Sequence, residues 1–498
     1  MLDQNQAEEL ASIDLKATLD WLATAPAIQT ADELPPLHSH LSALRDTKAA
    51  AHQQHEVLDQ LYARIHGVVQ RLLPELKGVS LPLSRRTRHT VRGMQDLLLM
   101  VAEFYLRALG TLDQHLIKGL RRPPELTLWR VLDALRSHLL ISNYAAAPAT
   151  PGVWLLLHQA YQTGVASEIS SIHVRGAEGT VEDVYLQTLL LSCAQPASFT
   201  SREIDLVFEY TQRFGGHAKF FTDGTLSCAD GSFWIDPGRD APPTASSRRP
   251  PPEGALCFTC EELSQLASEQ LAALEADAAP AQLDLPDSAN TPGGRGVIRR
   301  LAHYWGSPGK RRFPRRRQNY RAVLCVGLPA LWQLFHDDET QAGEITSWMV
   351  TNESPDGYAL MHVSGKTARI AAGDIVAIRT ESASDWQICI ARWALSENPE
   401  HLELGLQILA TKATPALLAS RSGESEYQQH PVLILPILPP IRLSEIIIAP
   451  CGTASGSKSD LILLIEKSNI EVREILAQAL QEQTASIEVI AIENRYEE

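Results

Sequence analysis

The chain has 498 residues, of which 44% are hydrophobic and 21% are charged, and its formal net charge is −15. This length is too great for one hydrophobic core, so the sequence predicts two to four domains of ordinary globular composition. The negative charge argues against a general affinity for nucleic acid or for anionic membranes.

The beginning of the chain has no targeting signal. Residues 1–10 lack the basic and apolar regions of a secretory signal. The most hydrophobic stretch, 432–441, is broken by prolines, and it is shorter than the roughly 20 apolar residues that a membrane span needs. The seven cysteines are scattered along the chain, which is typical of a reducing compartment. We therefore expect a cytoplasmic protein with no membrane insertion.

Residues 1–236 are expected to form a helical domain. Apolar residues recur at intervals of three and four along 41–73, 94–109 and 128–141, which is the spacing of a helix buried on one side. Turn residues such as Pro123 and Pro124 separate these stretches. Since no fixed repeat is present, the sequence predicts an irregular helical domain rather than a solenoid.

Residues 237–296 are expected to contain a proline-rich loop (237–255), a helix (261–276) and a linker (277–296). The linker is the stronger domain boundary, and its glycines at 293–296 are interpreted as a flexible hinge. Cys257 and Cys260 have C-x-x-C spacing, but no second pair or nearby histidines complete a zinc site. We expect structural cysteines and no metal site.

The hydrophobic period changes to two from residue 322 onward. Short β-type runs without long helices between them predict an antiparallel β-barrel domain over 297–412, which includes a basic N-terminal segment. Residues 413–498 are expected to form a small β-rich C-terminal module with a helix near 472–481. The fold class is therefore multidomain α+β.

The basic segment, 295–321, contains ten Lys or Arg residues and no Asp or Glu. Such a cluster in an acidic chain favours an anionic ligand that carries phosphate. Aromatic residues lie within it, and guanidinium and aromatic planes together can hold a purine. These aromatic residues are Tyr304, Trp305, Phe313 and Tyr320.

Two motifs flank the first predicted strands. Arg316-Arg317-Gln-Asn-Tyr-Arg321 comes directly before the first strand and resembles the R-x-x-x-R signature of PilZ domains. Asn352-Glu-Ser354-Pro-Asp-Gly357 is similar to the second signature of that family, [D/N]-x-S-x-x-G. Residues 388–393 and 402–408 resemble the closing strands of the same barrel. The resemblance covers 308–412.

The PilZ resemblance implies a receptor for cyclic di-GMP that needs no cofactor. It implies that the ligand-binding residues are Arg316, Arg317, Arg321, Asn352, Ser354 and Gly357. Arginine pairs at two points with a phosphate or with guanine O6 and N7, Asn352 can bond guanine N–H groups and Ser354 a phosphate or base edge, and Tyr320 could stack on a base. Gly357 would allow a positive φ and a close approach to the ligand.

Several alternatives stay open. Arg311, Arg312 and Arg315 also fit R-x-x-x-R, so another register is possible, and the acidic stretch 336–344 is interpreted as an insertion. Some PilZ domains act only as protein adaptors without nucleotide.

We find no motif of a nucleotide hydrolase, serine hydrolase or metalloprotease, so no catalytic residue and no enzyme activity are expected. The receptor would relay the signal to an unidentified protein partner by rearranging the helical domain when the basic segment becomes ordered. A rival interpretation is a nucleic-acid-binding protein that uses 295–321, which the net charge makes less favourable.

Overall fold

The computed structural model describes residues 15–47, 49–109, 123–221, 231–309, 313–336, 344–362, 368–398, 401–422, 426–439, 442–453, 461–466 and 469–495. The chain divides into two compact units. The helical unit comprises residues 1–79, 84–193 and 211–261, and the barrel unit comprises 80–83, 194–210 and 262–498.

Helices make up most of the helical unit, as the apolar spacing predicts. Leu58, Leu61 and Ile65 are fully buried on one side of α3, because side chains three and four positions apart share a helix face. The helices are α2 (Thr30–Asp46), α3 (Ala51–Leu76), α4 (Arg85–Leu109), α6 (Pro124–Tyr144), α7 (Val153–Ala166), α8 (Val181–Cys193) and the short η2 (Gly215–His217).

The proline-rich loop belongs to the helical unit and is held there by polar contacts. Asp240 accepts hydrogen bonds from the backbone N–H groups of Gly152 (2.6 Å) and Trp154 (3.0 Å), at the start of α7, where a carboxylate is stabilised by the helix dipole. The loop joins a small sheet of order β1-β4-β2-β3. Its strands are β1 (Lys219–Phe220), β2 (Ser232–Ile235), β3 (Thr244–Ala245) and β4 (Leu256–Thr259).

Helices precede the strands in the barrel unit, and the glycines that were expected to form a hinge begin one of these helices. Residues 293–296 form the first turn of α11, where Gly294 packs against the backbone of Ser288 and a Cβ on Gly296 would lie 2.7 Å from the carbonyl oxygen of Gln483. The prediction of a flexible hinge is therefore wrong, since these glycines serve close packing. The helices are η1 (Pro196–Ser198), α9 (Ser201–Phe214, of which the residues up to 210 belong to this unit), α10 (Glu261–Glu275), η3 (Pro280–Leu283), η4 (Asp287–Asn290) and α11 (Pro292–Gly306).

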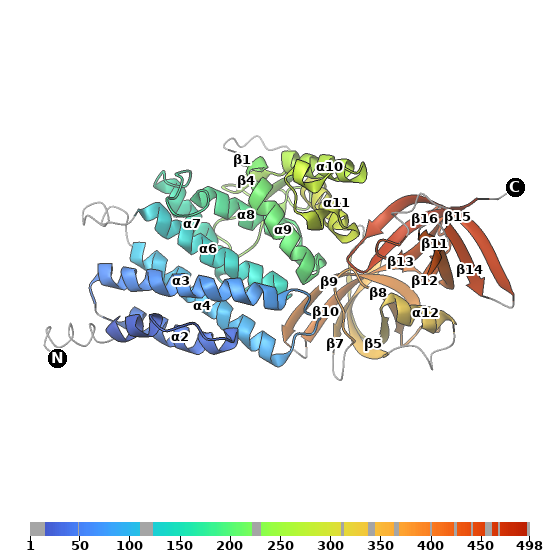
Figure 1. Ribbon diagram of the computed structural model, residues 1–498, viewed down its shortest axis with the longest axis horizontal. Coiled ribbons are helices and arrows are strands. Elements are labelled where there is room, and N and C mark those ends of the chain that lie inside the picture. Colours follow the sequence, from blue (N-terminus) through green and yellow to red (C-terminus); the bar gives the residue numbers. More distant parts are fainter. Residues whose placement is uncertain are drawn as a thin grey trace. The chain divides into compact units, whose positions relative to one another are not determined.

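The first barrel is closed and antiparallel, with strand order β10-β7-β6-β5-β8-β9 (Figure 1). Its strands are β5 (Arg316–Val326), β6 (Thr346–Ser354), β7 (Gly357–His362), β8 (Ile375–Thr380), β9 (Gln387–Asn398) and β10 (His401–Ala410), and α12 (Leu328–His336) follows β5. The barrel confirms the expected architecture. It starts at Arg316, however, so the arginine motif is part of a strand and not of an irregular segment before it. Most of the predicted insertion, 337–343, lies outside the described residues.

The second barrel is also closed, with strand order β11-β12-β13-β16-β15-β14. Its strands are β11 (Thr414–Ser422), β12 (Glu426–Leu435), β13 (Glu445–Pro450), β14 (Leu461–Glu466), β15 (Ile470–Gln483) and β16 (Ile487–Asn494). The expected helix near 472–481 is wrong, because this stretch is β15. Register shifts at 477/479 and 480/482 break the alternation of its side chains, so the sequence lacks a clear period of two there.

The two barrels share a hydrophobic core. Leu433, Ile446 and Val489 of the second barrel pack outward against Ile375 and Ile388 of the first, while alternate residues of the same strands fill the interior of the second barrel. Strands buried on both faces read as continuous apolar runs, which explains why 446–449 and 487–492 are almost wholly hydrophobic.

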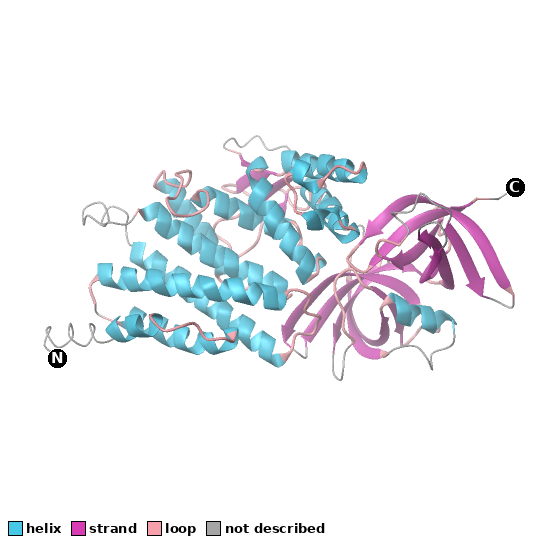
Figure 2. Cartoon of the chain, in the orientation of Figure 1, coloured by secondary structure: helices cyan, strands magenta, loops and turns pink. Residues whose placement is uncertain are grey.

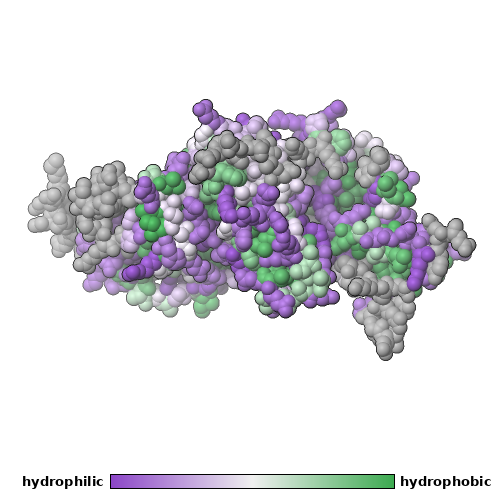
Figure 3. All heavy atoms as spheres, turned by 90° about the horizontal axis from the view of Figure 1, so that it is seen from above, coloured by the Kyte–Doolittle hydropathy of each residue, from purple (hydrophilic) through white to green (hydrophobic). Residues whose placement is uncertain are grey.

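Figure 2 shows the division between helices and strands along the chain. Figure 3 shows hydrophilic residues spread over the visible face, with smaller hydrophobic groups between them. Among the helices in the described part of the chain, none has both the length and the apolar character that a membrane span requires.

Candidate ligand-binding site

The pairing of β5 with β6 brings the two motifs together. Arg317 lies directly opposite Asn352, and Arg321 lies opposite Met349. Directly paired residues of antiparallel strands project on the same face, so Arg317 and Asn352 are neighbours across the ladder. One strand pairing thus brings together two residues that lie 35 positions apart in the sequence.

The arginine motif presents its two outer residues on one face of β5. A register shift lies between Arg317 and Tyr320, so their faces follow from their partners: Tyr320 pairs with Val350, which pairs with Leu360, whereas Arg317 pairs with Asn352, which pairs with Ala359. Neighbouring residues of a strand point to opposite faces, so Arg317 points to one side and Tyr320 to the other, and Arg321, the neighbour of Tyr320, points to the side of Arg317. Tyr320 donates a hydrogen bond to Glu353 (3.0 Å), and burial together with this bond raises the pKa of Tyr320. The expectation that Tyr320 stacks on a base is therefore wrong, because its ring is used on the opposite face.

Val350, Leu360 and Leu404 are almost fully buried, and they mark the inward face of their strands. Arg317 and Asn352 belong to the outward face. We call the paired residues across β5, β6, β7, β10 and β9 the outer row. They are Arg317, Asn352, Ala359, Gly405 and Trp393.

The asparagine motif forms the β6–β7 hairpin, in which Ser354 pairs with Gly357. The Ser354 hydroxyl donates to Asp356 Oδ1 at 2.5 Å and approaches the carbonyl oxygen of Gly357 at 3.2 Å. Its oxygen can still accept a hydrogen bond from a ligand.

A glycine is needed at position 357 for a reason other than the one expected. Gly357 is not among the residues with positive φ, so the predicted left-handed conformation is wrong. A Cβ at this position would overlap the backbone of Leu406 in β10. Glycine is required because β7 and β10 approach closely here. The residue therefore serves the packing of the two strands, and no special backbone conformation is involved.

The guanidinium groups of the motif are exposed. In the described part of the chain, Arg316, Arg317 and Arg321 form no ion pair or side-chain hydrogen bond, and all three are exposed. Arg316 lies opposite Glu353, so it projects on the other face from Arg317. Of the alternative register, Arg311 and Arg312 lie outside the described residues, and Arg315 is exposed just before β5.

Comparison with known proteins gives an independent view of the chain. The family model described as "Cyclic-di-GMP receptor FimW, N-terminal domain" matches residues 16–223. The model described as "Cyclic-di-GMP receptor FimW, middle PilZ domain" matches residues 333–415. Together the two models cover more than half of the chain. The chain is thus similar to FimW receptors over residues 16–223 and 333–415, and the second stretch is matched as a PilZ domain.

One curated relative is described as cyclic-di-GMP receptor FimW from Pseudomonas aeruginosa. It is 22% identical to this chain over 514 residues, which cover 86% of this chain and 83% of the relative. The PilZ match confirms the resemblance drawn from the motifs. The matched stretch includes the asparagine motif, while the arginine motif precedes it, as β5 precedes β6 in the PilZ barrel.

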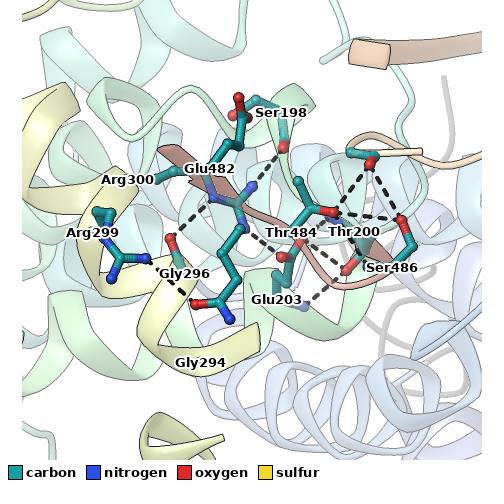
Figure 4. A network of polar contacts seen from close by, with 12 residues as sticks. Ser198, Thr200, Glu203, Gly294, Gly296, Arg299, Arg300, Glu482, Thr484 and Ser486 are labelled. Atoms are coloured by element: carbon teal, nitrogen blue, oxygen red, sulfur yellow. Dashed lines mark hydrogen bonds and ion pairs between the residues drawn. The ribbon is translucent and has the colours of Figure 1, made fainter. Parts of the chain in front are cut away.

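The first three arginines of the basic segment lie on α11 and have partners within the protein. Arg300 forms an ion pair with Glu203 and donates to the carbonyl oxygen of Ser198 (3.0 Å), as Figure 4 shows. Arg299 pairs with Glu275 at 2.6 Å, and Arg295 donates to Asn290 at 2.7 Å. These arginines are thus neutralised or satisfied within the protein.

Next to α11 lies a cleft of about 550 Å³. Its walls carry both signs of charge, with Arg295 and Arg299 facing Glu275 and Asp277. The cleft does not include any residue of the PilZ motifs. A balanced set of charges gives it no preference for a doubly charged ligand, so the outward face of the PilZ barrel is the better candidate site.

The cysteine pair is structural. Cys257 and Cys260 are buried, and burial raises the pKa of both thiols. A buried thiol with a raised pKa is unreactive at neutral pH. Among the described residues, no cluster of His, Cys, Asp and Glu could hold a metal ion.

Proposed function

We propose that this chain is a receptor for cyclic di-GMP and binds it on the outward face of the PilZ barrel. Arg317 and Arg321 would hold phosphates or guanine edges, Asn352 and Ser354 would bond the bases, Gly357 would keep the hairpin close to β10, and Arg316 would add charge at the rim. The observation that carries the proposal is the strand register that sets Arg317 beside Asn352. Two exposed guanidiniums without carboxylate partners offer the charge that a phosphate requires.

Titration calorimetry of the full chain with cyclic di-GMP tests this proposal. We expect saturable heat at micromolar ligand, and no comparable heat from cyclic di-AMP or from GMP at the same concentrations. No heat from cyclic di-GMP at tens of micromolar would contradict the proposal and favour an adaptor that binds protein alone. A response to duplex DNA that falls steeply with salt would favour the nucleic-acid alternative.

The relay to a partner is also a proposal. Ser198 and Glu203 belong to the stretch matched by the FimW N-terminal domain. Arg300, which lies on α11, contacts both residues. On the other side, Thr484 and Ser486 of the second barrel donate to the carbonyl oxygen of Gly373, just before β8 of the PilZ barrel, at 3.0 and 3.2 Å. A shift of the PilZ strands on ligand binding could pass to α9 through this network. A non-catalytic role and a cytoplasmic location stay predictions.

A further inference from the structure

We propose that the first turns of α4, together with Ile28, form a docking surface for an acidic segment of a partner protein that also carries an apolar side chain. The proposal concerns the helical unit and goes beyond the proposed function, because it holds whether or not cyclic di-GMP binds the PilZ barrel. We call this surface the docking face. It consists of Ile28, Arg85, Arg86, Arg88 and Arg92.

Positive charge is concentrated where α4 begins. Residues 76–95 contain five Lys or Arg residues and no Asp or Glu, and the first turn of α4 has no acidic residue. Arg85, Arg88 and Arg92 follow one another at intervals of three and four, which places them on one side of the helix. Arg85 and Arg92 are exposed, and neither forms an ion pair or a side-chain hydrogen bond with any residue that the structure describes.

This arrangement of cations is unfavourable in the isolated chain. The N-terminal end of a helix is stabilised by acidic and not by basic side chains, and like charges four residues apart repel each other. Burial, and after it the charge of Arg92, lowers the pKa of Arg88. Ser84 already accepts a hydrogen bond from the N–H of Thr87 at 3.1 Å, so the arginine side chains rather than the helix end would hold an anion. Carboxylates of a partner would relieve the repulsion.

An exposed apolar residue lies beside these cations. Arg86 donates a hydrogen bond to the side-chain oxygen of Gln29, and Ile28, the residue before Gln29, is 99% exposed. The following helix, α2, packs against α4, where a Cβ on Gly93 would lie 3.2 Å from Leu34 Cδ1 (Figure 1). A single exposed apolar side chain is common, but arginine next to an apolar side chain is typical of protein interfaces.

The size of the docking face favours a protein segment over a membrane or a nucleic acid. A helix rises 1.5 Å per residue, so Arg85 and Arg92 are about 10 Å apart along α4, and about three residues of an extended peptide span this length. A bilayer or a duplex would extend far beyond it. Residues 76–95 carry +5, so the rest of the chain carries −20, and this charge repels an extended polyanion.

Fluorescence polarisation tests the docking face with a labelled peptide in which Glu residues surround one Leu, titrated with the full chain. We expect Arg85→Glu and Arg92→Glu each to weaken binding by about five- to tenfold, because a charge pair across the interface becomes a repulsion. Ile28→Ser should weaken it by about tenfold through lost apolar burial. A peptide with Lys in place of Glu should not bind.

Arg175→Glu is the matched control. Arg175 is an exposed cation of the helical unit outside the docking face, so its replacement changes the net charge equally and should leave the affinity unchanged. Arg85→Glu should keep or raise the thermal unfolding midpoint, since an acidic residue is favoured at a helix N-terminus. A loss of binding in this variant is therefore not a loss of folding.

Three results would overturn the docking face. They are no binding of the acidic peptide to the unaltered chain, an equal loss in Arg175→Glu, and binding of the unaltered chain to phosphatidylglycerol vesicles or duplex DNA that Arg92→Glu abolishes. The last result would assign these arginines to a membrane or a nucleic acid instead. None of the three changes the heat expected from cyclic di-GMP, so the receptor proposal stands or falls separately.

Discussion

Arg317 and Arg321 are exposed cations on one side of a strand, and, like Arg316, they have no side-chain partner within the described residues. Arg299 and Arg300, in contrast, each face a glutamate. A charge without a partner at a rigid position is pre-organised to hold an anion.

Substitution of these two arginines should therefore weaken binding. We expect Arg317→Ala and Arg321→Ala each to cost about 1.5–3 kcal/mol, because a charge-assisted hydrogen bond is lost. Arg316→Ala should cost less, since its side chain projects on the opposite face. Calorimetric titration with cyclic di-GMP measures the three effects.

A suitable control is Arg369→Ala, which removes an exposed charge from the described connection between β7 and β8, at the end of the barrel away from the β6–β7 hairpin. It should bind as the unaltered chain does. Neutral effects at Arg317 and Arg321, with a strong effect at Arg315, would place the ligand on the alternative register instead.

At the residue scale, the sequence identified the motif residues but not all of their roles. Arg317, Asn352 and Ser354 were recognisable because their order matches a known signature. The role of Gly357 depends on Leu406, a relation that arises only from strand pairing. Composition around the arginines favoured Tyr320 as the stacking residue, yet its pairing with the buried Val350 puts its side chain on the inward face.

At the element scale, two arginine–glutamate ion pairs hold α11, and they differ in how deeply their side chains are buried. The side chains of Arg300 and Glu203 are 14% and 6% exposed, whereas those of Arg299 and Glu275 are 30% and 49% exposed. Buried pairs leave an uncompensated charge when one partner is removed, while exposed pairs are screened by water.

These pairs give a matched test of what holds α11 to α9. Glu203→Gln should lower the free energy of unfolding of the barrel unit by about 3 kcal/mol or more, and Glu275→Gln by about 0–1 kcal/mol. Arg300 and the N–H of Thr200 (2.8 Å) donate to different carboxylate oxygens of Glu203. Glutamine keeps only one acceptor oxygen, so the change removes the charge together with one of these hydrogen bonds. Urea unfolding of the two variants measures the difference, and equal losses would show that burial of the pair does not matter.

The elements also show where sequence patterns fail. Helices such as α3 were predictable because one apolar stripe repeats over several turns. The first turn of α11 was interpreted as a hinge because three glycines are usually flexible, but Gly294 and Gly296 pack against the backbone at Ser288 and Gln483. For β15 the strand bulges removed the period that identifies a strand.

At the scale of the whole molecule, the barrel unit is built from two closed barrels that share one hydrophobic cluster, while the interior of the second barrel forms another. The sequence predicted a PilZ-like barrel and a further β-rich module, but not their shared core, because apolar runs do not reveal which surface covers them. That the second barrel contacts both Gly373 and α11 makes it a candidate element for relaying ligand binding.

The central claim is that cyclic di-GMP binds the outward face of the PilZ barrel. Hydrogen–deuterium exchange of the full chain, with and without saturating cyclic di-GMP, tests both binding and its location. We predict slower exchange in peptides covering 316–326, 346–362 and 387–410, with the largest change at the start of β5 and in the β6–β7 hairpin. Protection confined to α11 and the cleft beside it, or no protection anywhere, would contradict the account.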